Sequence, residues 1–149
     1  MKLKSIKNTR GAAQVRRPRN LQQTKMSLVS RIANETRIWA ERTNEKLDDP
    51  FDSDLMGMCA IAAARLFLNL QKEKIDARIV ANNLHCFVAC DDIVVDVTAS
   101  QFGYSDVMVI KRDIAEKIDH WKTVHVFEDV DALVKWQLDS RWPPNQIAD

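Results

Sequence analysis

The sequence LHCFVACDDIVVDVT, residues 84–98, holds two apolar segments joined by a pair of aspartates. The flanking residues favour β-structure and Asp favours turns, so this stretch predicts an antiparallel hairpin that turns at Asp91-Asp92. A two-residue turn pairs Cys90 with Ile93. One face of the hairpin is then wholly apolar, with Leu84, Cys86, Val88, Cys90, Ile93, Val95 and Val97. A slip of one residue would exchange the two faces, so this segregation favours the register.

The opposite face of the predicted hairpin carries two polar residues that suit one another. His85 and Asp96 become diagonal neighbours, roughly 7–8 Å apart at the backbone, which side chains can bridge. An aspartate in a Val-rich strand is costly unless it has a partner. Two interpretations stay open: Asp96 orients a catalytic imidazole, or it makes a structural hydrogen bond to His85 or Thr98.

A cysteine precedes the hairpin at the start of an apolar segment. Residues 56–71 (MGMCAIAAARLFLNLQ) predict a buried helix, with Ser53 or Asp54 as candidate N-cap. Cys59 would lie where this helix begins, and the positive end of a helix favours a thiolate, the reactive form of cysteine. Gly57 allows a tight turn into the helix and leaves backbone amides open to face an oxyanion.

These motifs together resemble a known group of proteins. A cysteine at a buried helix start, then HCFV at residues 85–88 and VDVTASQF at residues 95–102, resembles the transglutaminase-like branch of the papain-like cysteine hydrolases, in particular bacterial and phage members. The resemblance covers residues 54–110. It implies a papain-like/transglutaminase-like α+β fold, with helices packed on a small antiparallel sheet.

The resemblance also implies roles for individual residues. Cys59 would be the nucleophile, His85 the general base and acid, and Asp96 the residue that orients the imidazole. Gln101 matches the pattern without an assigned role: it would either hydrogen-bond near the site or hold its loop. The chain departs from the pattern at Phe87, where Trp is more usual, in a short interval between cysteine and histidine, and in lacking an acidic calcium loop. These departures weaken any inference to protein crosslinking.

The remainder of the chain predicts elements around this centre. Residues 26–47 read as an amphipathic helix with Ser27 as its cap and Trp39 as a core anchor. We expect further strands at 75–82, 107–110 and 124–127, and helices at 112–120 and 129–142. Residues 1–25 carry eight Lys or Arg and no acid, which predicts a flexible basic arm before a single domain at 26–149.

The composition bears on membrane insertion, on the state of the thiols and on metal binding. No run of eighteen apolar residues exists, so we expect no membrane span. Three cysteines cannot all pair within one chain, and we expect reduced thiols in the cytoplasm. His85, Cys86 and Cys90 do not suit zinc because neighbouring strand residues point to opposite faces, and no paired C-x-x-C occurs. His120 and His125 could supply another imidazole, but we expect surface or core roles for both.

The sequence leaves two functions open. The first is cysteine-dependent acyl chemistry without a cofactor, on a protein or peptide substrate: amide hydrolysis, deamidation or acyl transfer through Cys59, His85 and Asp96. The second is a non-catalytic domain of the same fold that binds nucleic acid or an acidic partner through residues 1–25.

Overall fold

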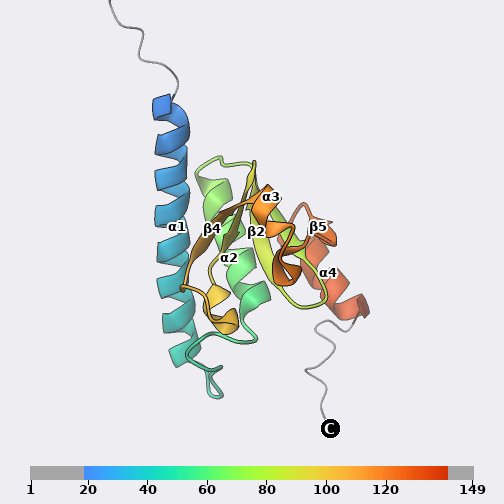
Figure 1. Ribbon diagram of the computed structural model, residues 1–149. Helices are drawn as coiled ribbons and strands as arrows, with labels where there is room; N and C mark the ends of the chain where they lie inside the picture. The colour runs from blue at the N-terminus through green and yellow to red at the C-terminus, as the bar shows by residue number, and fades with distance from the viewer. Residues whose placement is uncertain (1–18, 141–149) are drawn as a thin grey trace, which may run out of the picture.

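The computed structural model describes residues 19–140, and the side chains from residue 21 onward. Its helices are α1 (Arg19–Glu45), α2 (Cys59–Lys72), α3 (Arg112–Ala115) and α4 (Val130–Ser140), with 3₁₀ helices η1 (Ala99–Phe102) and η2 (Asp119–Trp121). Its strands are β1 (Arg78–Ala81), β2 (Cys86–Cys90), β3 (Ile93–Asp96), β4 (Met108–Lys111) and β5 (His125–Phe127). In Figure 1, α1 runs along one side of the molecule and α4 lies on the other.

The strands form one antiparallel sheet in the order β4-β3-β2-β1-β5. The prediction of an α+β domain is therefore confirmed. The predicted hairpin register is also confirmed, because Cys90 pairs with Ile93 and Val88 pairs with Val95. Four strands are shorter than the predicted ranges, and β4 has the predicted length but lies one residue later in the chain.

Both faces of the central strands β2 and β3 are buried, each in its own apolar cluster. The face under α1 and α2 contributes Cys86, Val88, Cys90, Ile93, Val95 and Val97 to the main core. The opposite face places Val80, Phe87, Ala89 and Val94 against Ala115 and Trp121. Leu84 departs from the prediction, since it is 62% exposed in the turn before β2. Burial on both faces explains why residues 86–90 and 93–96 are almost uninterruptedly apolar.

Helix α1 begins at Arg19, so the predicted boundary at residue 25 is wrong for the part of the arm that is described. Ser27 lies inside the helix and does not cap it. Leu, Gln and Lys at 21–25 have high helix propensity, which outweighs the local positive charge. Lys25 also pairs with Asp91, which ties this end of the helix to the hairpin turn. Residues 1–18 and 141–149, including Trp142, lie outside the described residues.

Two more boundaries differ from the prediction. Helix α2 begins at Cys59, and its N-cap position is Met58, which makes no side-chain capping bond; neither Ser53 nor Asp54 is the cap. The helix predicted at 112–120 is divided into α3 and η2. Within residues 19–140, no helix has both the length and the apolar content that a bilayer span requires.

Candidate active site

The candidate catalytic residues meet at the open end of the β2–β3 hairpin, opposite its turn. His85 directly precedes β2 and Asp96 ends β3, so the confirmed register brings them to the same end of the sheet. Cys59 begins α2, which packs against β2 and β1. All three side chains belong to residues that are at most 7% exposed.

Asp96 is the most heavily hydrogen-bonded residue of this site. His85 Nε2 lies 2.7 Å from Asp96 Oδ2, and Trp121 Nε1 donates to the same oxygen at 2.8 Å. The backbone N–H of Thr98 donates to Oδ1 at 2.9 Å, and its hydroxyl lies 3.3 Å from that oxygen. A buried carboxylate needs such compensation, because burial without partners would protonate it.

The Cys59 side chain lies close enough to the His85 imidazole to help raise the pKa of that ring. The preceding loop sets its position through two residues with positive φ, Leu55 (62°) and Gly57 (94°). Leu55 is anchored by its buried side chain and by a 2.8 Å bond from its N–H to Asp52 O. The prediction that Cys59 lies at a helix start is confirmed; its role as a nucleophile stays a prediction.

Burial and charge compete at the histidine and the aspartate. Burial alone would lower the pKa of His85, but the Asp96 carboxylate, by charge and hydrogen bond, and the Cys59 thiol raise it to about 9. Burial would raise the pKa of Asp96, but the His85 imidazole and the bonds from Trp121 and Thr98 hold it below its usual value. The geometry therefore favours a charged imidazolium–carboxylate pair.

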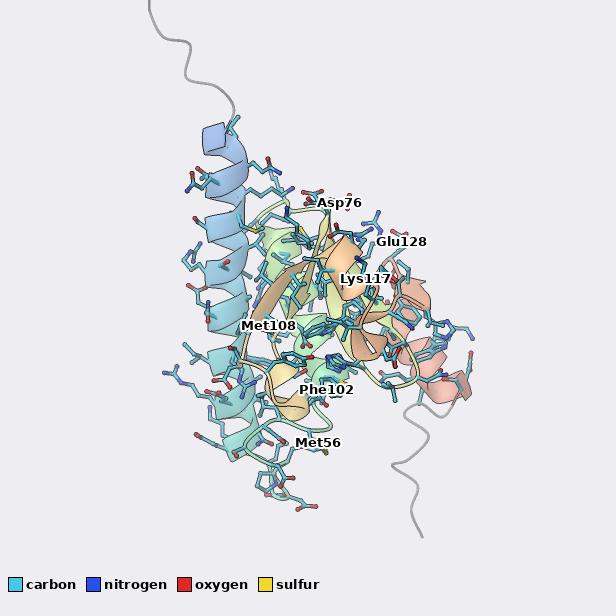
Figure 2. The ribbon with its side chains drawn as sticks, in the orientation of Figure 1. Met56, Asp76, Phe102, Met108, Lys117 and Glu128 are labelled. Atoms are coloured by element: carbon cyan, nitrogen blue, oxygen red, sulfur yellow. The ribbon has the colours of Figure 1, made fainter. Side chains whose placement is uncertain are left out.

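The two accessory candidates come from η1 and from the loop before α2. Gln101, on η1, places its Nε2 3.2 Å from His85 Nδ1. Gly57 lies two residues before Cys59 in the left-handed region, where glycine is favoured, consistent with the predicted tight turn. Ser100 Oγ donates to Asp54 O at 2.8 Å and so joins η1 to the loop before α2. Figure 2 shows Phe102 of η1 and Met56 of this loop toward the same end of the molecule.

An aromatic group beside the imidazole was not predicted. Phe102 packs edge-on against His85, with ring centroids 4.8 Å apart, and stacks on His120 at 4.3 Å. His120 in turn contacts Trp121, which is 1% exposed. Burial, and then the charge of His85, lower the pKa of His120. Trp121 and His120 come from η2, an irregular segment whose sequence has no period that would place them beside residue 85.

A buried arginine supports the loops around the site and was also missed. Arg37 Nη1 donates to Val97 O at 3.1 Å, Ser100 Oγ at 2.8 Å and Asp106 O at 3.3 Å. Its Nε pairs with Glu41 Oε1 at 2.8 Å. Arg37 thus joins α1 to the segment that follows β3 and carries Gln101. The sequence did not indicate that Arg37 is buried, because a charged residue in an amphipathic helix ordinarily lies on the solvent face.

The remaining candidates lie away from this constellation. Cys86 and Cys90 are buried thiols of the main core, as predicted, and burial raises the pKa of both. The ring of His125 contacts those of Phe127 and Trp136. Among residues 19–140, no group of three or more His, Cys, Asp or Glu side chains has an arrangement that could hold a metal ion.

The fold and site define an α+β domain with a buried cysteine, histidine and aspartate at one end of an antiparallel sheet. Comparisons of the chain with protein-family models, with curated proteins and with solved structures find no match.

Proposed function

We propose that this protein performs cysteine-dependent acyl chemistry on an amide, with the papain-like/transglutaminase-like arrangement that the motifs resemble. The observation that supports this most is a buried His85 imidazole that has the Asp96 carboxylate 2.7 Å from its Nε2 and the Cys59 side chain near enough to help raise its pKa. In a purely structural Asp–His pair, nothing requires a thiol on the free side of the ring. Here the thiol, the base and the orienting group stand in series.

The reaction follows from these positions. His85 Nδ1 takes the thiol proton, and the Cys59 thiolate forms a bond to the amide carbonyl carbon, giving a tetrahedral oxyanion. The C–N bond then breaks, and the imidazolium returns its proton to the leaving amine. Water attacks the resulting thioester for hydrolysis or deamidation, and an amine attacks it for transfer. Asp96 stays ionised throughout and holds His85 Nε2.

Backbone amides at the start of α2 are suited to stabilise the oxyanion. The N–H of Met58 is bonded to Leu55 O at 3.0 Å, which assigns it to the loop. Cys59 is the first helical residue, and the first N–H groups of a helix have no partner within it. The N–H of Cys59 itself is therefore our candidate oxyanion donor, strengthened by the positive end of the helix.

The substrate class in this proposal is a protein or peptide amide. The chemistry of the three residues needs no cofactor, because the thiol supplies the nucleophile and the imidazole moves the proton. His85 is fully buried, whereas Cys59 retains 7% exposure. A substrate carbonyl therefore meets the sulfur first, and the imidazole acts from behind it.

The pH dependence of iodoacetamide alkylation, resolved by peptide, tests the proposal. We expect Cys59 to be labelled rapidly near pH 6 in the wild type and at least tenfold more slowly in His85→Ala, with Cys86 and Cys90 protected by burial. His125→Ala is the matched control, since it removes an imidazole outside the site and should leave Cys59 labelling unchanged. Equal, slow labelling of Cys59 in all three proteins would refute catalysis and favour a binding domain.

A further inference from the structure

The side-chain amide of Gln101 has more acceptors around it than protons to give. Its Nε2 lies 3.0 Å from Thr98 O, 3.0 Å from Thr98 Oγ1 and 3.2 Å from His85 Nδ1. Because a carbonyl oxygen only accepts hydrogen bonds, the contact with Thr98 O requires the NH₂ group at this position. One amide proton serves Thr98 O, and the second is shared between the hydroxyl and the imidazole.

The imidazole has one nitrogen left for two donors. Nε2 of His85 is committed to Asp96 at 2.7 Å, so a neutral ring carries its proton there and presents a single lone pair at Nδ1. The Gln101 amide lies against that lone pair, and Cys59 acts on the same ring. In the proposed reaction, Nδ1 is also the atom that takes the thiol proton. When the ring gains a proton from the thiol, Nδ1 becomes a donor and can no longer accept from Gln101.

We propose that Gln101 favours the neutral form of the His85 imidazole, in opposition to Asp96, and gives up this contact by turning its second amide proton to Thr98 Oγ1 when His85 is protonated. This inference rests on the proposed function and adds a restraint on the same site. The hydroxyl already lies at hydrogen-bond distance, so the change needs no movement of η1.

Three other groups act on the charge of the same ring. Asp96, on β3, favours the imidazolium, and so does a thiolate at Cys59 on α2. His120, on η2, opposes it when protonated, although burial keeps that ring neutral over more of the pH range. Gln101 is uncharged and favours the neutral ring through a hydrogen bond. Its effect differs from theirs because it depends on one hydrogen bond and is insensitive to salt.

Replacing Gln101 with methionine keeps the length of the side chain and removes its donor. Loss of one hydrogen bond to the neutral ring should raise the pKa of His85 by up to about one unit. Alkylation of Cys59 near pH 6–7 should become about 2- to 10-fold faster, since the thiolate–imidazolium state loses its competitor. A role confined to holding η1 would instead slow labelling and leave the pKa of His85 unchanged.

The test combines this alkylation assay with ¹⁵N NMR titration of labelled histidines in the full chain. Gln71→Met is the matched control, because Gln71 is exposed at the far end of α2. Gln101→Asn is the second variant: its shorter amide should not reach Nδ1, so it should change both readouts in the same direction as Gln101→Met. A His85 pKa equal to that of the wild type in both variants would overturn the proposal.

The same experiment separates this inference from the proposed function. If the pKa of His85 rises in the Gln101 variants and Cys59 labelling accelerates, both stand. If His85→Ala abolishes rapid labelling but the Gln101 variants behave as wild type, only the inference about Gln101 fails. If Cys59 is inert in every protein while the pKa of His85 still rises, Gln101 controls the imidazole but the acyl chemistry is refuted.

Discussion

Replacing Asp96 with asparagine should test both the stability and the electrostatics of the site. The substitution keeps the size of the side chain but removes its charge. His85 Nε2 and Trp121 Nε1 both approach Oδ2, whereas the Thr98 N–H approaches Oδ1. An asparagine can offer its one oxygen to only one of these two sides. Its NH₂ group must then face at least one buried donor.

The expected loss follows from these contacts. Hydrogen bonds to a buried charged group contribute about 1.5–3 kcal/mol each, and breaking a buried ion pair by removing one partner costs about 3–5 kcal/mol. Because the contributions overlap, we expect the free energy of unfolding to fall by about 3–5 kcal/mol. Burial then dominates at His85, so its pKa should drop from about 9 to below its usual value of 6.5.

Urea unfolding and histidine NMR measure these two effects at neutral pH. Asp92→Asn is the matched control, because it removes an exposed carboxylate from the turn of the same hairpin. We expect this control to change stability by less than about 0.5 kcal/mol. A loss below about 1 kcal/mol in Asp96→Asn, with an unchanged His85 pKa, would show that the carboxylate does not hold the imidazole.

Three further outcomes are expected. Since the pKa of His85 is raised from 6.5 to about 9, the stability that its protonation contributes is complete below about pH 6.5 and is lost as pH rises through 9. The free energy of unfolding should fall by at most about 3–4 kcal/mol across this range, and a flat profile would contradict this expectation. Trp121→Phe removes the indole donor to Asp96 and should cost about 1.5–3 kcal/mol in urea unfolding; no loss would mean the bond is unimportant. Arg37→Lys should lower the melting temperature by several degrees, whereas the exposed Arg31→Lys should not; equal effects would exclude a special role for the buried guanidinium.

The hairpin and its polar pair were predictable because strand alternation is local. A fixed turn at Asp91-Asp92 sets the register, and the register places His85 and Asp96 on one face. The start of α1 differs from the prediction because helix propensity in residues 19–25 outweighs the repulsion between their positive charges. The prediction failed for Leu84 because alternation does not indicate where a strand begins, and β2 begins only at Cys86.

The residues that complete the site were not predictable for a different reason. Trp121 and Arg37 reach it from η2 and α1, elements far from the hairpin in sequence, through single long side chains. The sequence around each residue does not indicate which acceptor the indole N–H or the guanidinium will bind. Such contacts depend on how the elements pack, and a period in the sequence reports only which face of an element is buried.

Asp96 has hydrogen-bond donors other than His85, and these donors help to keep the site stable. Strand β3 is buried on both faces, so the Asp96 carboxylate at its end has no solvent to hydrate it. The Thr98 N–H and the Trp121 indole supply hydrogen bonds that do not depend on the charge of His85. The carboxylate therefore keeps partners when the imidazole is neutral as well as when it is protonated. A base that must gain and lose a proton in each reaction cycle requires a counter-ion of this kind, because an aspartate held by His85 alone would lose much of its stabilisation whenever the imidazole became neutral.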